Sequence, residues 1–393
     1  VLTTTAATVF NGGFASNDGS SVIAADGASD NAYVMNIKNQ EATDGRSYGV
    51  NIEAGSNATD SAVLIKTHDA NNTLFRIHGN GQATFVDGTA SLPSITNTGD
   101  LNTGIFFPAA DTIGLVTGGV ERFRISSDGS LSTPTLGTSN VRFGVNAGDG
   151  ILDTGNYNVV VGDEAGTAIT TGDYNVGVGY AANLSVVTTS GNTAIGSTSG
   201  KYVTGANNTH VGYAAGQGIS GVPAAGDNNT TVGANAGLLL QGAATGNTFV
   251  GALSGDATTT GVRNTAIGHQ SFSTNSAGDF NTALGRDALF NNTTADSNTG
   301  VGYGSLYTNA EGTANVAVGY NALDANTVSN NTAVGYDSLG SNTTGTGNTA
   351  VGKDAGEFAT TADASTFIGF QAGQGITGVK LTGNDNTAVG ASA

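Results

Sequence analysis

The sequence predicts an all-β protein whose greater part is a repetitive β-solenoid, or β-roll, of 17-residue coils preceded by β-rich N-terminal shaft regions. Three observations lead to this prediction. The 393 residues include 62 Gly but only 4 Pro and no Cys, which is unlike ordinary globular composition. A five-residue motif recurs about every 17 residues from about residue 140 onward. Within the motif, residue types alternate with the period of two that is typical of a strand.

Composition limits the partners of the chain. Its formal net charge is −18, from 30 acidic and 12 basic residues, which disfavours binding to nucleic-acid phosphates and anionic lipid. No apolar run reaches the roughly 18 residues that a membrane-spanning helix needs. Because Cys is absent, backbone ladders and packing must hold the fold without disulfides or thiolate metal sites. We therefore expect no nucleic-acid partner and no membrane insertion.

The repeat has Asn at position 1, Thr or Val at position 2, a mostly small residue at position 3, an aliphatic residue or Phe at position 4 and Gly at position 5. Position 8 is Ala or Ser in every clear copy. A degenerate copy at Asn140–Gly144 precedes the clear ones. In six consecutive copies the motif begins at Asn264, Asn281, Asn298, Asn315, Asn331 and Asn348 and ends at Gly268, Gly285, Gly302, Gly319, Gly335 and Gly352.

The length of the repeat and its pattern predict the architecture. Seventeen residues are too few for a pair of helices but suffice for two strands of about five residues joined by two turns. Stacked coils would pair strand on strand at a spacing of ~4.8 Å. We expect the motif glycines to align in a column along the rod. We also expect the motif Asn side chains to form a ladder that connects neighbouring coils.

The two faces of the motif strand predict self-association. Positions 1, 3 and 5 point one way and positions 2 and 4 the other. The narrow coil favours the small residues inside and an outward column at position 4, although the two faces could exchange roles. In either case a thin coil cannot bury both faces, so the apolar column needs a partner. We predict a homotrimeric fibre, with a dimer as the alternative, because three thin rods enclose a shared apolar core more fully. Its axis would be lined by Ile267, Leu284, Val301, Val318, Val334 and Val351.

The chain divides into three expected regions: a β-rich shaft or sandwich at 1–90, a β segment at 91–135 and the solenoid at 136–393. Turns are expected at Gly118-Gly119 and Asp128-Gly129. Strands are expected at Ala32–Ile37, Thr73–Ile77, Gly104–Phe107 and Glu121–Ile125. Two coils of 21 residues carry near-identical insertions, Gly216–Val222 and Gly373–Val379, which we expect in surface loops, either as contact loops or as enlarged turns.

Other repeated side chains receive structural interpretations. Five tyrosines directly follow motif glycines and predict an outward ladder of stacked rings, with a sugar-contacting row as the alternative. They are Tyr180, Tyr213, Tyr303, Tyr320 and Tyr336. The four histidines lack metal-ligand spacing and are expected to be surface substitutions. They are His68, His78, His210 and His269.

No catalytic, cofactor-binding or metal-binding residue is specified by the sequence. Glycine-rich segments abound, but none forms a phosphate-binding loop with its Lys. Asp163 with Glu164, or Glu53 with Asp60, could be nominated as a carboxylate pair for polysaccharide hydrolysis. Neighbours on a strand point to opposite faces, and nothing distinguishes these acids from the others. We therefore expect no enzymatic activity and no cofactor.

One stretch resembles a segment common in bacteriophage tail-fibre proteins. The Asn-Thr-Ala-Val-Gly copies resemble repeats of the same fibre proteins, and also the head repeats of trimeric autotransporter adhesins, which form left-handed β-rolls in trimers. The N-terminal part of the resemblance favours the phage proteins. The residues that resemble the fibre segment are Leu92–Ile95, Asp100–Phe106, Asp111–Gly114 and Gly118–Ile125.

The resemblance implies a structural fibre protein of a phage tail or similar virion appendage. Such a protein would lie on the virion or outside the cell, associate with itself and with other appendage proteins, and contact a host-surface glycan or protein. Members of the fibre group often end in an intramolecular chaperone that is cleaved off. This chain ends at Ala393 without one, which leads us to expect a processed or truncated product.

Three alternative functions share parts of the pattern. A bacterial surface adhesin, or the subunit of a secreted extracellular filament, would use the same architecture. A polysaccharide depolymerase would need the carboxylate pair that the sequence does not specify. An ice-binding solenoid would need a regular Thr face, whereas Val159, Val176 and Val316 interrupt the Thr column.

Overall fold

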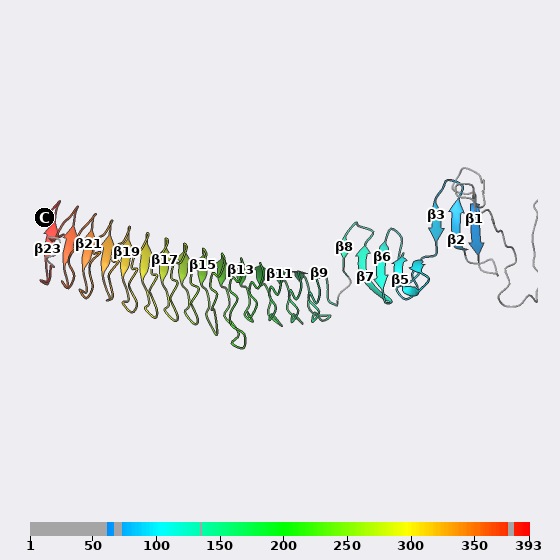
Figure 1. Ribbon diagram of the computed structural model, residues 1–393, viewed down its shortest axis with the longest axis horizontal. Coiled ribbons are helices and arrows are strands. Elements are labelled where there is room, and N and C mark those ends of the chain that lie inside the picture. The colour runs from blue at the N-terminus through cyan, green and yellow to red at the C-terminus, as the bar shows by residue number, and fades with distance from the viewer. Residues whose placement is uncertain (1–60, 67–72, 134–135, 376–380) are drawn as a thin grey trace, which may run out of the picture. The chain divides into compact units, whose positions relative to one another are not determined.

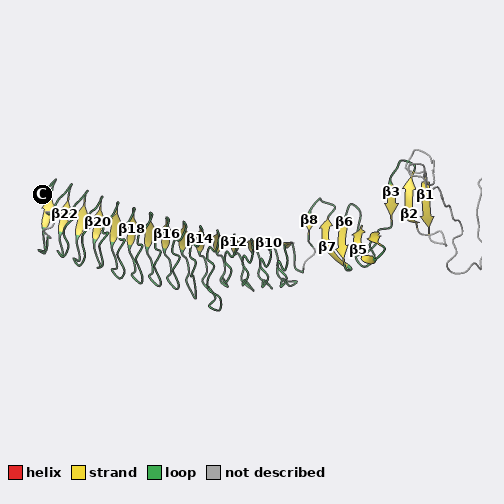
Figure 2. Ribbon diagram, in the orientation of Figure 1, coloured by secondary structure: helices red, strands yellow, loops and turns green. Residues whose placement is uncertain are grey.

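The computed structural model describes residues 61–66, 73–133, 136–375 and 381–393. The strand expected at Ala32–Ile37 lies outside these residues. All regular structure in the described part is β-strand, which confirms the all-β prediction (Figures 1 and 2). The chain divides into two units, Val1–Val86 and Asp87–Ala393, and each is described by itself.

Three antiparallel strands form the described part of the first unit. They are β1 (Ser61–Lys66), β2 (Thr73–His78) and β3 (Ala83–Phe85), and β2 contains the strand predicted there. The rings of Phe75 and Phe85 lie across the β2–β3 pair with centroids 5.1 Å apart. Such an aromatic cross-strand pair stabilises a small sheet.

A five-stranded antiparallel meander opens the second unit. Its strands are β4 (Ile95–Asn97), β5 (Asp100–Phe106), β6 (Ile113–Thr117), β7 (Val120–Ile125) and β8 (Leu131–Ser132). Gly118 and Gly119 join β6 to β7 with φ of 59° and 76°, the left-handed geometry of a tight hairpin turn. Gly129, at φ 83°, lies in the turn between β7 and β8. Both predicted turns are therefore present.

The solenoid follows, with one short parallel strand in each coil, stacked in sequence order from β9 to β23 (Figure 1). Neighbouring strands pair position for position, as in Thr265 with Thr282 and Thr282 with Thr299. The predicted solenoid of 17-residue coils is thus confirmed. The strands are β9 (Val141–Phe143), β10 (Val159–Val161), β11 (Val176–Val178), β12 (Thr193–Ile195), β13 (Thr209–Val211), β14 (Thr230–Val232), β15 (Thr248–Val250), β16 (Thr265–Ile267), β17 (Thr282–Leu284), β18 (Thr299–Val301), β19 (Val316–Val318), β20 (Thr332–Val334), β21 (Thr349–Val351), β22 (Thr366–Ile368) and β23 (Thr387–Val389).

The prediction of two five-residue strands per coil is wrong. Within the described residues each coil has one strand of three residues, and turns, bends and a few isolated bridges make up the remainder. The reason is that left-handed backbone recurs along the coil, which an extended strand cannot contain. In one coil Asp287 at position 7, Leu289 at position 9 and Ser297 at position 17 have φ of 57°, 52° and 60°.

The motif glycines form the expected column, and the geometry explains why only Gly occurs there. Gly285 has φ 137°, a region that L residues with a side chain rarely adopt. A Cβ on Gly285 would also lie 2.5 Å from the carbonyl oxygen of Gly302 in the next coil. Gly268 and Gly302 make the same approach to their following coils, at 2.4 and 2.3 Å. Position 5 is therefore fixed by both backbone conformation and space.

The interior of the coil holds mostly small residues at position 3, as predicted. Ala266, Ala283 and Ala350 are fully or almost fully buried there. Positions 2 and 4 of the same strands stay partly exposed, so the column at position 4 faces outward in the single chain. Larger interior residues at position 9 were not predicted. They are Phe272, Leu289, Leu306, Leu323 and Leu339, all fully or almost fully buried.

Positions 3 and 9 compensate each other in volume. Where position 3 carries Phe249 or Phe367, position 9 of the same coil is Gly255 or Gly373. A Cβ on Gly255 would lie 2.7 Å from the Phe249 ring, and one on Gly373 would lie 2.1 Å from the Phe367 ring. Where position 9 is Leu, as at Leu289, position 3 is Ala or Gly. These coils therefore fill the narrow interior with one large side chain from either position.

The insertion at Gly216–Val222 has its tip at the surface, as expected. Ser220, Gly221 and Val222 are exposed, and the backbone N–H of Val222 donates to the Ile219 carbonyl at 3.1 Å. This bond closes a tight turn in which Gly221 has φ 79°. The second insertion, Gly373–Val379, lies mostly outside the described residues.

Candidate functional site: the stacked side-chain columns of the solenoid

The position-4 column is an apolar feature that continues along the outside of the solenoid. Its side chains project from the face of the sheet opposite to the buried position 3. Leu284 is 45 % exposed and Val318 is 36 % exposed. The six residues predicted to line a trimer axis all belong to this column, in β16 to β21. A contiguous apolar column of this length exceeds what a soluble monomer normally exposes.

The motif Asn residues make the same contacts in coil after coil. The backbone N–H of Asn281 donates to Asn264 Oδ1 at 2.9 Å, and that of Asn298 donates to Asn281 Oδ1 at 2.9 Å. The side-chain amide of Asn281 donates to the Ala295 carbonyl at 2.8 Å. Each buried Asn therefore satisfies polar groups of both neighbouring coils. The backbone contact continues, at 2.9 Å each, in Asn315, Asn331 and Asn348.

A second buried Asn ladder at position 12 was missed by the sequence reasoning. The side-chain amide of Asn292 donates to Asn275 Oδ1 at 3.1 Å, and that of Asn326 donates to Asn309 Oδ1 at 3.2 Å. Asn342 continues the ladder with a 2.9 Å bond to Asn326 Oδ1. The signal was present as Asn recurring at a spacing of 16 or 17 residues, each placed three residues after the buried position 9.

Acidic residues at position 16 bind backbone between coils. Asp279 Oδ1 accepts from the N–H of Val262 at 2.7 Å, and the N–H of Asp279 donates to Asp296 Oδ1 at 2.7 Å. Asp363 accepts in the same way from the N–H of Thr346 at 2.8 Å. These carboxylates therefore satisfy turn amides of the preceding coil.

Three of the tyrosines at position 6 form a ladder of rings. Tyr303, Tyr320 and Tyr336 stack, with centroid distances of 5.2 and 5.0 Å and interplanar angles of 13° and 8°. Cations from the same column cover the two ends. Arg286 lies 6.0 Å from the Tyr303 ring centroid, and Lys353 lies 5.4 Å from that of Tyr336.

The other two tyrosines at position 6 do not stack. Tyr180 and Tyr213 are separated by the coil that carries Ser197 at this position. Neither ring belongs to a stack within the described residues. The predicted ladder of rings is therefore present in Tyr303, Tyr320 and Tyr336 only.

The expectation that the histidines are surface substitutions is wrong for His210. This residue occupies position 3 and is 1 % exposed. His269 is exposed, as expected, and His78 in β2 is half-buried. His68 lies outside the described residues.

The surroundings of His210 explain how the coil holds an imidazole ring. Its Nδ1 bonds to Thr231 Oγ1 at 2.8 Å, and burial lowers the pKa of His210 to about 4. Gly216 at position 9 of the same coil provides the room, because a Cβ there would lie 2.1 Å from the ring. His210 is therefore a neutral interior residue at neutral pH.

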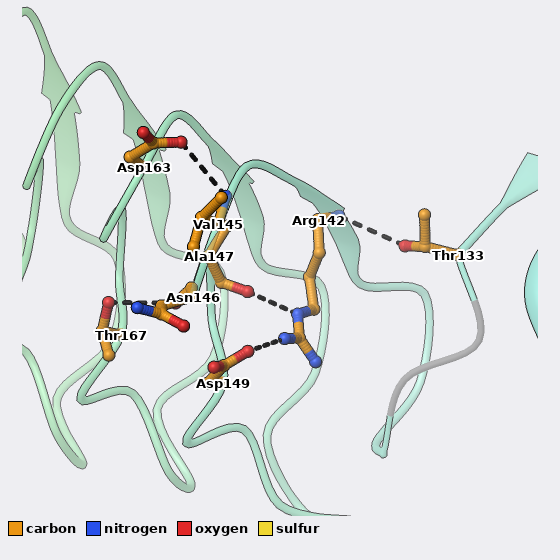
Figure 3. Close-up of polar contacts among 8 residues, drawn as sticks. All are labelled: Thr133, Arg142, Val145, Asn146, Ala147, Asp149, Asp163 and Thr167. Atoms are coloured by element: carbon orange, nitrogen blue, oxygen red, sulfur yellow. Dashed lines mark hydrogen bonds and ion pairs between the residues drawn. The ribbon is translucent and has the colours of Figure 1, made fainter. Parts of the chain in front are cut away.

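The first coil is closed by polar contacts (Figure 3). Arg142 occupies position 3, where later coils hold mostly small or apolar residues, and its guanidinium bonds to the Ala147 carbonyl at 2.5 Å and to the Asp149 carboxylate. The backbone N–H of Arg142 donates to Thr133 Oγ1 at 3.2 Å. A polar cover of this kind is what a terminal coil of a solenoid needs.

The acids nominated for hydrolysis occupy turns or lie outside the described residues. Asp163 Oδ1 accepts from the N–H of Val145 at 3.1 Å, as Figure 3 shows. Glu164 lies in a left-handed turn at φ 58°. Glu53 and Asp60 lie outside the described part of the chain. Asp163 therefore serves a contact between coils.

Acidic side chains gather at one hollow on the solenoid surface. It measures about 180 Å³ and is lined by Asp324, Asp337, Gly340, Ser341 and Glu357. Burial raises the pKa of Asp324, and the charge of Asp337 adds to the effect. Burial also raises the pKa of Asp337, followed by the charge of Glu357. In the described part of the chain, no group of three His, Asp or Glu residues is placed to hold a metal ion.

Comparisons with known proteins add no further assignment. No family model, curated protein or solved structure matches this chain. The described residues contain no helix long and apolar enough to cross a membrane.

Proposed function

We propose that the chain is a structural subunit of an extracellular appendage, such as a bacteriophage tail fibre, and that it assembles as a parallel homotrimer. The observation that carries the proposal is the position-4 column. Coil after coil leaves Val, Ile or Leu partly exposed on one face of a sheet whose other face is already covered by the interior of the coil. A surface of this kind is stabilised when a partner removes it from water.

Identical columns on identical chains favour closed cyclic symmetry. Three thin rods placed around a common axis cover their columns more fully than two rods do. The resemblance of the repeat to tail-fibre and adhesin proteins supports the same arrangement. In such a trimer association adds to the stability of the fold, so the unfolding midpoint should rise with chain concentration.

A structural role also accounts for the polar residues of the repeat. The Asn side chains at positions 1 and 12 bond between coils, and so do the Asp carboxylates at position 16. These groups are engaged in joining one coil to the next. This use of the polar groups suits a fibre that extends by adding coils.

The test introduces Asp residues into the position-4 column in one variant and at another exposed position of the repeat in a control variant. We expect Ile267→Asp, Leu284→Asp and Val301→Asp together to place nine carboxylates near the trimer axis, where each would be poorly hydrated and unpaired. Light scattering should report three times the 38.7 kDa chain mass for the unmodified protein and a single chain mass for this variant. Circular dichroism should show that the variant keeps its solenoid, because the replaced side chains are partly exposed in the single chain.

The matched control uses position 14, which is exposed in the same three coils. Glu311 is the natural residue there in one coil, so Ala277→Asp and Thr294→Asp complete an acidic row. This control should keep the mass of the unmodified protein. The proposed assembly is wrong if the unmodified chain is monomeric, or if the column variant retains the trimer mass.

A further inference from the structure

The ring ladder at position 6 covers its own faces. Tyr320 lies between Tyr303 and Tyr336, with centroids 5.2 and 5.0 Å away, so both faces of its ring are in contact with other rings. Arg286 and Lys353 cover the two end faces. A ligand ring has no free aromatic face to stack on in this part of the column.

Tyr180 and Tyr213 occupy the same position in the repeat but lack the ring between them. The coil that separates them has Ser197 at position 6. Within the described residues, neither tyrosine contacts another ring or a cation, in contrast to the three stacked tyrosines. Tyr213 is 63 % exposed and Tyr180 is 50 % exposed, compared with 44–46 % for the three stacked tyrosines. At Ser197 the column therefore lacks a ring between two tyrosines.

We propose that the gap over Ser197 is a binding slot for one hexopyranose ring, held between Tyr180 and Tyr213. Two coil steps separate these tyrosines, or roughly 10 Å at the usual strand spacing. The same two steps in the ladder accommodate one ring, that of Tyr320. In the proposed fibre, this slot would be the point of contact with a host-surface glycan. That biological role rests on the proposed function, whereas sugar binding itself does not.

The two tyrosine faces determine which sugar fits. A ring held between them must present C–H groups on both of its faces. In a β-glucoside the substituents are equatorial, so H1, H3 and H5 lie on one face and H2 and H4 on the other. An axial hydroxyl would instead be pressed against a tyrosine ring without a hydrogen-bond partner, which weakens binding. The slot therefore favours β-gluco-configured pyranosides over galacto-configured ones, and the Ser197 hydroxyl can bond to an equatorial substituent.

Saturation-transfer NMR on the full chain tests the slot, with methyl β-D-glucopyranoside as the probe. We expect saturation of both proton sets, H1/H3/H5 and H2/H4, and a Kd of about 1 mM, the range of a weak single-site ligand. Methyl β-D-galactopyranoside should bind at least about fivefold more weakly, which corresponds to the loss of about 1 kcal/mol for one contact. Stacking on one exposed tyrosine would saturate a single proton set, and that result would overturn the proposal.

Three substitutions test the position of the slot. Ser197→Tyr inserts the missing ring and should abolish binding, whereas Ser197→Ala should weaken it by no more than about fivefold, the loss of one hydrogen bond. Tyr320→Ser removes a ring from the ladder and should create a second site between Tyr303 and Tyr336, raising the stoichiometry from one to two sugars per chain. The slot assignment is refuted if Ser197→Tyr binds as the unmodified chain does, or if the unmodified chain does not bind.

The experiment separates this inference from the proposed assembly. The probe should bind both the unmodified chain and the variant with Asp in place of Ile267, Leu284 and Val301, because the slot lies within one chain. Binding by a chain that proves monomeric supports the slot and overturns the trimer. A trimer that does not bind the glucoside supports the assembly and overturns the slot.

Discussion

His210 should make the solenoid sensitive to mild acid. Burial lowers the pKa of its ring from 6.5 to about 4, so the folded chain resists a proton that the unfolded chain accepts. Above pH 6.5 both states hold the neutral ring and His210 causes no pH dependence. As the pH falls from 6.5 to 4, the unfolded state binds more protons and the free energy of unfolding decreases. The decrease reaches about 2 to 3 kcal/mol near pH 4.5, from about 1.4 kcal/mol per unit of pKa difference.

The control is His210→Phe, because the repeat already uses Phe at this position. Phe249 and Phe367 occupy position 3 of coils that have Gly at position 9, as the coil of His210 does. The variant leaves the Thr231 hydroxyl without its bond to the ring, which costs about 1 kcal/mol at every pH. It has no ring to protonate, so between about pH 7.5 and pH 4.5 its free energy of unfolding should fall by about 2 to 3 kcal/mol less than that of the unmodified chain.

Urea unfolding followed by circular dichroism at the two pH values measures this difference, at one chain concentration. Carboxyl groups with raised pKa, such as Asp256 and Asp324, act in the opposite direction, because their folded form gains a proton first as the pH falls. They are common to both proteins and cancel in the comparison. Equal pH dependence in the two proteins would refute the reasoning, and so would a His210 NMR signal that titrates above about pH 6.

Two further substitutions test the contacts between coils, both by urea unfolding. Gly285→Ala should destabilise by about 3 kcal/mol, because it combines a strained φ with a close approach to Gly302, whereas Gly347→Ala, at φ 69° with no atom nearer than 3.9 Å, should cost about 1 kcal/mol. Similar costs at both glycines would contradict the column geometry. Asn309→Ala should cost about 2 kcal/mol, because it removes a 2.7 Å bond to a carbonyl and an acceptor from the next Asn, while the exposed Thr294→Ala should stay within about 0.5 kcal/mol. A neutral Asn309→Ala would show that the second ladder contributes nothing to stability.

The parts of the fold that the sequence could predict are those that recur in all or most coils. Gly at position 5 must repeat because every coil needs the same strained backbone and the same close approach, as at Gly285. The small residue at position 3 repeats because the interior is narrow, as at Ala283. A constraint that acts on every coil leaves a periodic pattern in the sequence, and that pattern indicated the stacking and the inward face.

The parts that escaped prediction depend on compensation between positions or on the ends of the stack. The burial of His210 follows from the absence of a side chain at Gly216, six residues away, and not from its own place in the motif. The predicted strand length was wrong because bulky residues such as Leu289 adopt a left-handed backbone conformation in this solenoid, which such residues rarely do in other proteins. Arg142 closes the first coil of the stack, so no repeat could reveal its role.

Because the strands are short and pair in sequence order, the hydrogen bonds of the solenoid run from each coil to the next. A pull applied at the two ends of the stack would load these bonds along their length and peel the coils off singly from a terminus. Each peeled coil of about 17 residues would release roughly 55 Å of extended chain in place of one ~4.8 Å step. The solenoid would thus yield under tension in many small equal steps and dissipate the energy of each, and regain its length by recoiling when the load is removed.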